Sequence, residues 1–111
     1  MSKPRYIWWT YVRRMVEKYP ARVRAGPVQA DGLDGLVNRE VEAVRAAIEE
    51  TDDLTMNLIA AYYWRGPKGL EAAAAACYIS ERNAIYRHGR FIRRVAEKFF
   101  DVEKTGKDEN E

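Results

Sequence analysis

Apolar residues recur along this chain at steps of three and four, the spacing that brings side chains onto one face of an α-helix. Such stripes cover residues 1–19, 36–50, 54–64 and 81–99, and an alanine-rich stretch covers residues 70–77. No segment shows the strict alternation of apolar and polar residues that indicates a half-buried strand. The pattern therefore predicts an all-α fold of five helices, arranged as a small helical bundle with a separate N-terminal aromatic helix.

The first predicted helix, residues 1–19, is amphipathic. Pro20 is expected to end it, because proline lacks an N–H and clashes with the preceding turn. Residues 20–35 contain two prolines and three glycines without an apolar period, so they are interpreted as a linker. The apolar stripe of the helix is either ordinary core or a subunit interface that would make a homodimer. Its members are Trp8, Tyr11, Val12, Met15, Val16 and Tyr19.

The second predicted helix, residues 36–50, has a buried face of valine and isoleucine at steps of four, three and four. Its glutamates are expected to face water: Glu40, Glu42, Glu49 and Glu50. Residues 51–53 supply polar caps for a third helix over residues 54–64. The glycines and proline of residues 66–69 then interrupt the chain.

The two C-terminal helices, residues 70–77 and 81–99, are predicted to form a helix-turn-helix over residues 70–99. Five consecutive alanines in the first helix let the two helices approach closely, and Ala84 provides a small side chain on the second. Ser80 is placed to accept N–H groups at the start of the second helix. In this motif the second helix enters the major groove of DNA.

One side of the last helix is basic, and its first turns carry side chains suited to reading bases. Arginine pairs bidentately with guanine and asparagine with adenine. His88 lies among the arginines and is interpreted as a phosphate contact or a surface residue. The alternative for the whole face is a solvated basic helix. The candidate DNA-contacting residues are Ser80, Glu81, Arg82, Asn83, Tyr86, Arg87, Arg90, Arg93 and Arg94.

Short segments at both ends of the chain carry a family resemblance. At the start they are Lys3-Pro4-Arg5-Tyr6, Trp8-Trp9 and Tyr11-Val12, and toward the end they are Tyr63-Trp64-Arg65, Leu70-Glu71-Ala72-Ala73-Ala74, Ile79-Ser80, Arg90-Phe91-Ile92 and Val95-Ala96-Glu97-Lys98-Phe99. Together they resemble phage-encoded RinA/ArpU-type transcription regulators, whose helix-turn-helix is similar to the fourth region of bacterial sigma factors. The resemblance implies a sequence-specific DNA-binding regulator of phage or prophage origin. Residues 36–100 are expected to form the helical DNA-binding domain, and the polar, acidic residues 101–111 are expected to form an acidic tail.

Composition narrows the classes of function. The chain has one His and one Cys and no glycine-rich phosphate loop, so neither an enzyme nor a metal or other cofactor is expected. No apolar run approaches the roughly 20 residues that span a membrane, and no signal peptide precedes the first helix, so a cytoplasmic location in a bacterial host is expected.

Charge separates into blocks along the chain. Residues 1–30 carry seven Lys or Arg and one Glu, whereas residues 31–53 carry two Arg and eight Asp or Glu. Residues 54–98 are basic again, which suits a protein with one face toward double-stranded DNA and another away from it. Two alternatives stay open: a protein-interaction module that binds RNA polymerase, and a DNA-recognition component of phage packaging.

Overall fold

The computed structural model describes residues 7–27, 33–66 and 69–100, and these described residues form helices and their connections without any strand. The helices are α1 (Trp9–Ala25), α2 (Leu33–Glu49), α3 (Asp53–Ile59), α4 (Leu70–Ala76) and α5 (Glu81–Phe100). A π-helical segment, η1 (Ala60–Trp64), extends α3. The prediction of an all-α fold with five helices is confirmed, and the expected acidic tail lies outside the described residues.

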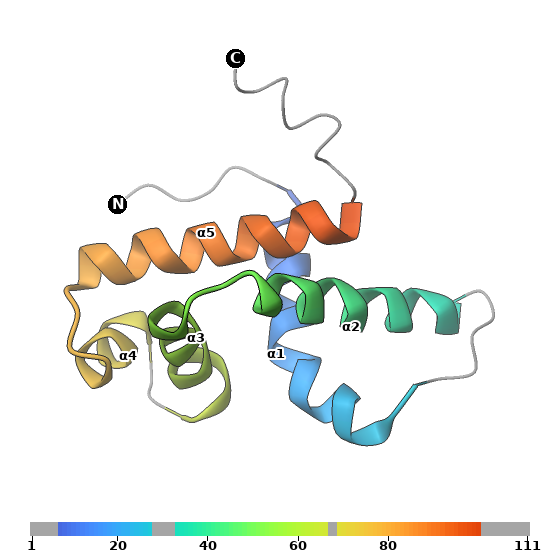
Figure 1. Ribbon diagram of the computed structural model, residues 1–111, viewed down its shortest axis with the longest axis horizontal. Helices are drawn as coiled ribbons and strands as arrows, with labels where there is room; N and C mark the ends of the chain where they lie inside the picture. The colour runs from blue at the N-terminus through green and yellow to red at the C-terminus, as the bar shows by residue number, and fades with distance from the viewer. Residues whose placement is uncertain (1–6, 28–32, 67–68, 101–111) are drawn as a thin grey trace, which may run out of the picture.

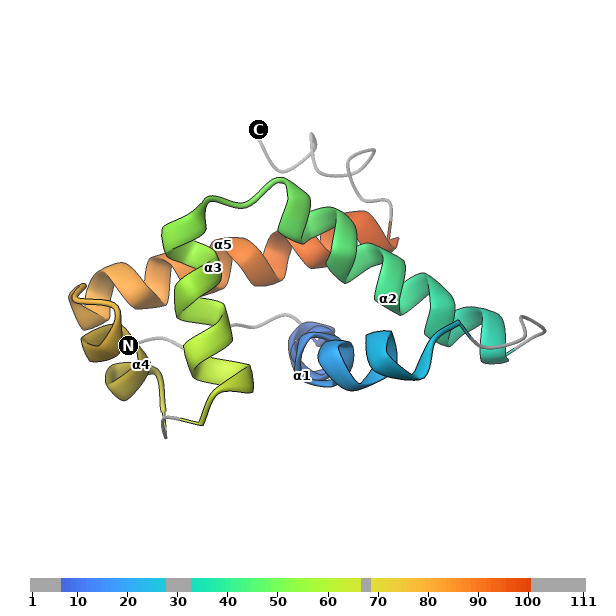
Figure 2. The same ribbon diagram turned by 60° about the horizontal axis from the view of Figure 1, so that its bottom comes forward.

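Helix α5 runs along the molecule and contacts all four other helices (Figures 1 and 2). Its N-terminal half lies over α3 and α4, and its C-terminal half lies over α1 and α2 (Figure 1). Helix α5 packs against all four helices because its sequence is amphipathic, with a stripe of mostly apolar side chains along one side. The buried residues of α5 are Ala84, His88, Phe91, Ile92, Val95 and Ala96.

Two separate cores lie under α5. The larger core joins α1, α2 and the C-terminal half of α5, and its buried members are Val12, Met15, Val16, Ala43, Val44, Ala47, Ile59, Phe91, Ile92, Val95 and Ala96. Eight partly buried side chains, six of them aromatic, pack around it. The alanine core joins α3, η1, α4 and the start of α5 through Leu58, Ala61, Ala73, Ala74 and Ala84.

Helix α1 continues through Pro20 to Ala25, so the prediction that Pro20 ends the helix is wrong. A proline inside a helix leaves the carbonyl four residues earlier without its N–H donor. That carbonyl belongs to Val16, and it accepts a hydrogen bond from Trp64 Nε1 at 2.9 Å. The indole of a residue in η1 thus replaces the missing backbone donor. Of the expected linker, residues 20–25 belong to α1 and residues 33–35 to α2.

The N-terminal helix is not separate from the bundle, in contrast to the expectation. Val12 and Val16 are fully buried in the larger core. Glu40 is also not on the surface as expected, because the residue is only 5% exposed. It accepts hydrogen bonds from the Tyr11 hydroxyl and, at 2.6 Å, from Arg22 Nη1. These two donors come from α1, so the Glu40 side chain joins α2 to α1 by hydrogen bonds.

In the described part of the chain, none of the helices combines the length and the apolar character needed to cross a bilayer.

Candidate nucleic-acid interface

The α4–α5 corner is built from small side chains and an N-cap at the start of α5. Ala73 and Ala74 of α4 are buried against Ala84 of α5, so no large side chain separates the two helices. The Ser80 hydroxyl oxygen accepts a hydrogen bond from the Asn83 backbone N–H at 3.0 Å, which confirms Ser80 as the N-cap of α5. Glu81 is exposed in the first turn, where a negative charge suits the helix dipole.

The turn between the two helices has an unusual residue at its left-handed position. The Ile79 N–H donates to the Ala74 carbonyl and the Tyr78 N–H to the Ala75 carbonyl, each at 3.1 Å. This pair of bonds is a Schellman motif, whose left-handed residue is usually glycine. Here that residue is Tyr78, with φ 62° and a side chain that is 94% exposed. The turn is therefore strained at a fully exposed tyrosine.

An exposed ridge runs along the outer side of α5, opposite the core. Its members follow at steps of four, four and three residues: Arg82, Tyr86, Arg90 and Arg93. Tyr86 is 58% exposed, and Arg90 lies over its ring at 5.6 Å and donates to its hydroxyl at 3.2 Å. Arg82 and Arg93 have no partner among the described residues. The ridge thus presents three cations and one aromatic ring to solvent.

The neighbouring flank of α5 faces the corner between α2 and α3. Arg87 donates to Asp52 Oδ2 at 3.0 Å, to Thr55 Oγ1 at 2.8 Å and to Asn83 Oδ1 at 3.1 Å. Two of its partners lie at the start of α3, so Arg87 joins α5 to α3, and Asn83 of the same helix helps to hold the Arg87 side chain. Asp52 also caps α3 by accepting from the Thr55 N–H at 3.1 Å. Hydrogen bonding to Thr55, first by its side chain and then by its backbone N–H, holds the pKa of the Asp52 carboxyl below the usual value.

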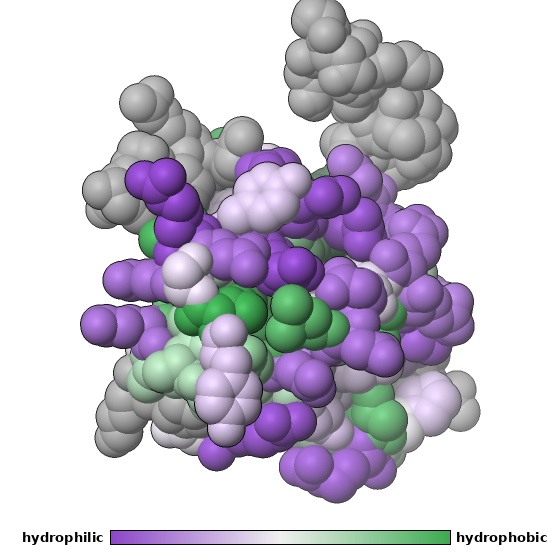
Figure 3. All heavy atoms as spheres, turned by 60° about the vertical axis from the view of Figure 1, so that its left-hand side comes forward, coloured by the Kyte–Doolittle hydropathy of each residue, from purple (hydrophilic) through white to green (hydrophobic). Residues whose placement is uncertain are grey.

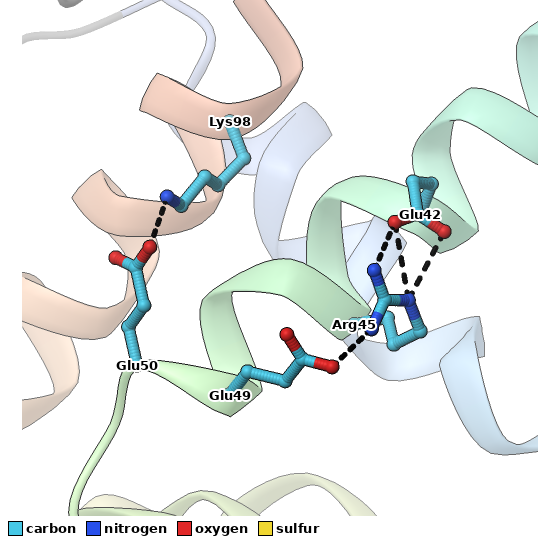
Figure 4. Close-up of polar contacts among 5 residues, drawn as sticks. All are labelled: Glu42, Arg45, Glu49, Glu50 and Lys98. Carbon is cyan, nitrogen blue, oxygen red and sulfur yellow. Dashed lines mark hydrogen bonds and ion pairs between the residues drawn. The ribbon is translucent and has the colours of Figure 1, made fainter.

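Further along the same flank, two more cations meet the end of α2. Arg94 Nη1 donates to the Glu50 carbonyl at 2.8 Å and to Thr51 Oγ1 at 3.3 Å. Lys98 forms an ion pair with the Glu50 carboxylate (Figure 4), which lowers the pKa of that carboxyl. A groove of about 330 Å³ lies between this flank and the α2–α3 corner, lined by Glu50, Thr51, Asp52, Thr55, Tyr86, Arg87, Arg90, Phe91 and Arg94.

His88 lies on the buried side of α5, so its interpretation as a phosphate contact or surface residue is wrong. Its ring is 8% exposed, and its Nε2 is 2.6 Å from the Tyr63 hydroxyl. Because that hydroxyl accepts from Arg13 Nε at 2.8 Å, its own proton is donated to His88. Burial, and secondarily the charge of Arg13, lowers the pKa of His88 to about 4. The imidazole is therefore neutral near pH 7 and acts as an acceptor.

The sequence pattern did not identify the partners of α5. Arg13, Tyr63 and Glu50 position His88 and Lys98, yet they lie 25 to 75 residues away from them along the chain. The signal present in the sequence is charge: the acidic block of residues 31–53 includes Glu50 and Asp52, which pair with cations of the basic last helix.

The stripe proposed as a subunit interface packs largely within its own chain. Met15 is buried in the larger core, and Tyr19 stacks on Trp64 with ring centroids 6.1 Å apart. Tyr11 is 38% exposed and bonds Glu40. Ordinary core is thus the alternative that the contacts favour, and a homodimer through α1 stays a prediction.

The described residues contain no group of His, Cys, Asp and Glu side chains that could hold a metal ion. The surface at the α4–α5 end combines apolar patches with long hydrophilic side chains (Figure 3).

No protein-family model, curated protein or solved structure matches this chain, so the resemblance carried by its short motifs remains an expectation.

Proposed function

We propose that this protein is a sequence-specific regulator of transcription, of phage or prophage origin, that binds double-stranded DNA. In this proposal α4 and α5 act as a helix-turn-helix, and the ridge of α5 lies in the major groove. The observation that carries it is the ridge itself. Three exposed arginines and a tyrosine follow directly after a tight, capped turn, on the side of α5 that no other helix covers.

Hydrogen bonds within the protein reduce the number of α5 side chains that are free to contact DNA. Asn83, Arg87 and Arg94 are bonded to other side chains or to the α2–α3 corner. Arg82 and Tyr86 stand in the first two turns of α5 with exposed side chains. We therefore assign base reading to Arg82 and Tyr86, and we assign Asn83 a supporting role through Arg87.

Arg90 and Arg93 are assigned to the DNA backbone. Arg93 lies eleven residues after Arg82, or about 16 Å along the axis at 1.5 Å per residue. A helix that enters the groove by its N-terminal turns is leaving it at that distance, where phosphates are the nearest groups. Phosphate contacts carry affinity for any sequence, whereas base contacts carry sequence preference.

The test begins with selection of bound sequences from a random duplex pool. Arg82→Ala is expected to lose about 1–3 kcal/mol on the selected site and little on a scrambled duplex, because it removes a base contact. Arg93→Ala is expected to weaken both duplexes equally and to reduce the salt slope by about 0.9. Arg45→Ala, which removes a cation from α2 instead, is the matched control and should change neither.

Absence of any enriched sequence, with equal loss from Arg82→Ala and Arg45→Ala, would rule out this docking. A footprint over a promoter supports a transcriptional role, whereas a footprint at a packaging site supports the packaging alternative.

A protein-interaction module is the second candidate, and one observation favours it. Tyr78 and Ile85 are 94% and 40% exposed, and the α4 alanines Ala72, Ala75 and Ala76 are exposed beside them. Exposed apolar side chains gathered at one end of a small protein are typical of a protein contact. Binding of purified RNA polymerase that is lost in Tyr78→Ser but unchanged in Arg93→Ala would support this candidate.

A further inference from the structure

The end of α2 places a carboxylate against the basic flank of α5. Glu50 is the last residue before the corner, and its side chain is 54% exposed. It pairs with Lys98, and its Oε1 lies 3.9 Å from Arg94 Nε (Figure 4 shows the Lys98 pair). Both cations are only partly exposed, at 26% for the Arg94 side chain and 30% for Lys98.

These two cations stand where a groove-bound helix meets the DNA backbone. They lie on the flank beside the ridge, in the C-terminal half of α5, twelve and sixteen residues after Arg82. A carboxylate accepts the same charge-assisted hydrogen bonds from Arg and Lys that a phosphate oxygen accepts. The Glu50 carboxylate and a DNA phosphate therefore compete for Lys98, whereas Arg94 is held mainly by the Glu50 backbone carbonyl and by Thr51.

We infer that the Glu50 carboxylate limits the affinity of this protein for DNA of any sequence, because it holds Lys98 away from the DNA backbone. This inference rests on the proposed DNA-binding function. Backbone contacts strengthen binding to every duplex, so a protein that withholds one of them binds random DNA less tightly. The base-reading ridge is untouched by Glu50, so the difference between the preferred site and random DNA is retained at lower overall affinity.

The chain provides a matched control one residue earlier. Glu49 has the same charge and a similar exposure, but it pairs with Arg45 of its own helix rather than with α5. Arg45 is shared with Glu42, so this network stays entirely within α2 (Figure 4). Glu49→Gln and Glu50→Gln thus change the net charge equally, and only the second releases Lys98 on α5.

The experiment measures the affinity of wild type, Glu50→Gln and Glu49→Gln for a scrambled duplex over a range of salt concentrations. Each released cation that meets a phosphate adds about 0.9 to the log–log slope, so Glu50→Gln, which releases Lys98, is expected to steepen it by about 0.9. At moderate salt the scrambled duplex is expected to bind roughly two- to fivefold more tightly, the range typical of exposed ion pairs. Glu49→Gln is expected to leave the slope unchanged.

A third variant tests whether the released cation is responsible. Adding Lys98→Ala to Glu50→Gln is expected to return the slope to the wild-type value. Thermal unfolding of each protein confirms that the variants remain folded, because exposed ion pairs contribute little to stability.

The outcomes separate this inference from the proposed function. Equal slopes for Glu50→Gln and Glu49→Gln, in a protein that does bind DNA, overturn the role of Glu50 and leave the proposed function standing. Failure of every variant to bind any duplex overturns both. A steeper slope that persists after removal of Lys98 also overturns the inference.

Discussion

The larger core and the alanine core hold this molecule together by different means. In the larger core, big side chains meet across helices, and polar bonds join residues far apart in the chain: Trp64 to Val16 across 48 positions and Arg13 to Tyr63 across 50. In the alanine core, Ala73, Ala74 and Ala84 let two neighbouring helices touch, and the connection is closed by bonds within a few residues.

The difference has a consequence for stability and for function. Long-range polar bonds inside the larger core must be complete, because a buried donor or acceptor without a partner costs about 1–3 kcal/mol. The alanine core contains few such bonds, and its weak point is the strained turn at Tyr78. The proposed DNA-reading ridge thus starts at the α4–α5 corner, which is closed by bonds between near neighbours. The opposite side of α5 packs on the larger core, where the polar bonds join distant residues.

The largest expected effect concerns acid and the larger core. The pKa of His88 is lowered to about 4 from an ordinary 6.5, so the unfolded chain binds the proton first as the pH falls. The stability from the neutral ring is complete above pH 6.5 and is lost between pH 6.5 and 4, by about 3 kcal/mol in total. Urea unfolding at pH 7, 5.5 and 4 measures this loss.

His88→Gln is the control, because its side chain can still accept from Tyr63 but does not titrate. The carboxyls with lowered pKa, Glu42, Glu50 and Asp52, also lose their contribution at low pH in both proteins. The slope that remains in His88→Gln is therefore theirs. Identical pH dependence in the two proteins would contradict the assignment to His88.

A smaller effect, a coupling free energy of about 1 kcal/mol between positions 64 and 20, is expected where the Trp64 indole replaces a helical hydrogen bond. Trp64→Phe leaves the Val16 carbonyl without a donor and is expected to cost about 1–3 kcal/mol, in addition to the lost packing. In a Pro20→Ala background the new backbone N–H can bond Val16 instead, so the same substitution should cost about 1 kcal/mol less. Denaturant unfolding of the four proteins gives this coupling, and additive effects would show that the indole N–H does not compensate for Pro20.

The smallest effect concerns the turn beside the alanine core. Tyr78→Gly is expected to stabilise the protein by about 1 kcal/mol, because glycine adopts the left-handed conformation without the steric cost of a Cβ. Tyr78→Ala keeps the Cβ and is expected to show no such gain. Thermal unfolding compares them, and an equal gain in both variants would mean that the tyrosine ring, rather than the backbone conformation, carries the strain.

The sequence by itself determined the features that depend on near neighbours. The amphipathic period of α5, the Ser80 cap and the small residues at Ala73, Ala74 and Ala84 all act within one or two helical turns. Such local rules predict the number and class of the helices, and they predict the α4–α5 corner.

Only the tertiary structure decided the features that depend on distant partners. Pro20 stays within α1 because Trp64 supplies the missing donor, and Glu40 is buried because Tyr11 and Arg22 meet it there. Likewise, which arginines of α5 remain exposed is decided by the α2–α3 corner. A hydrogen bond or ion pair between residues 25 or more positions apart produces no periodic pattern in the sequence. The sequence therefore does not distinguish a side chain whose partner is water from one whose partner is DNA or another helix.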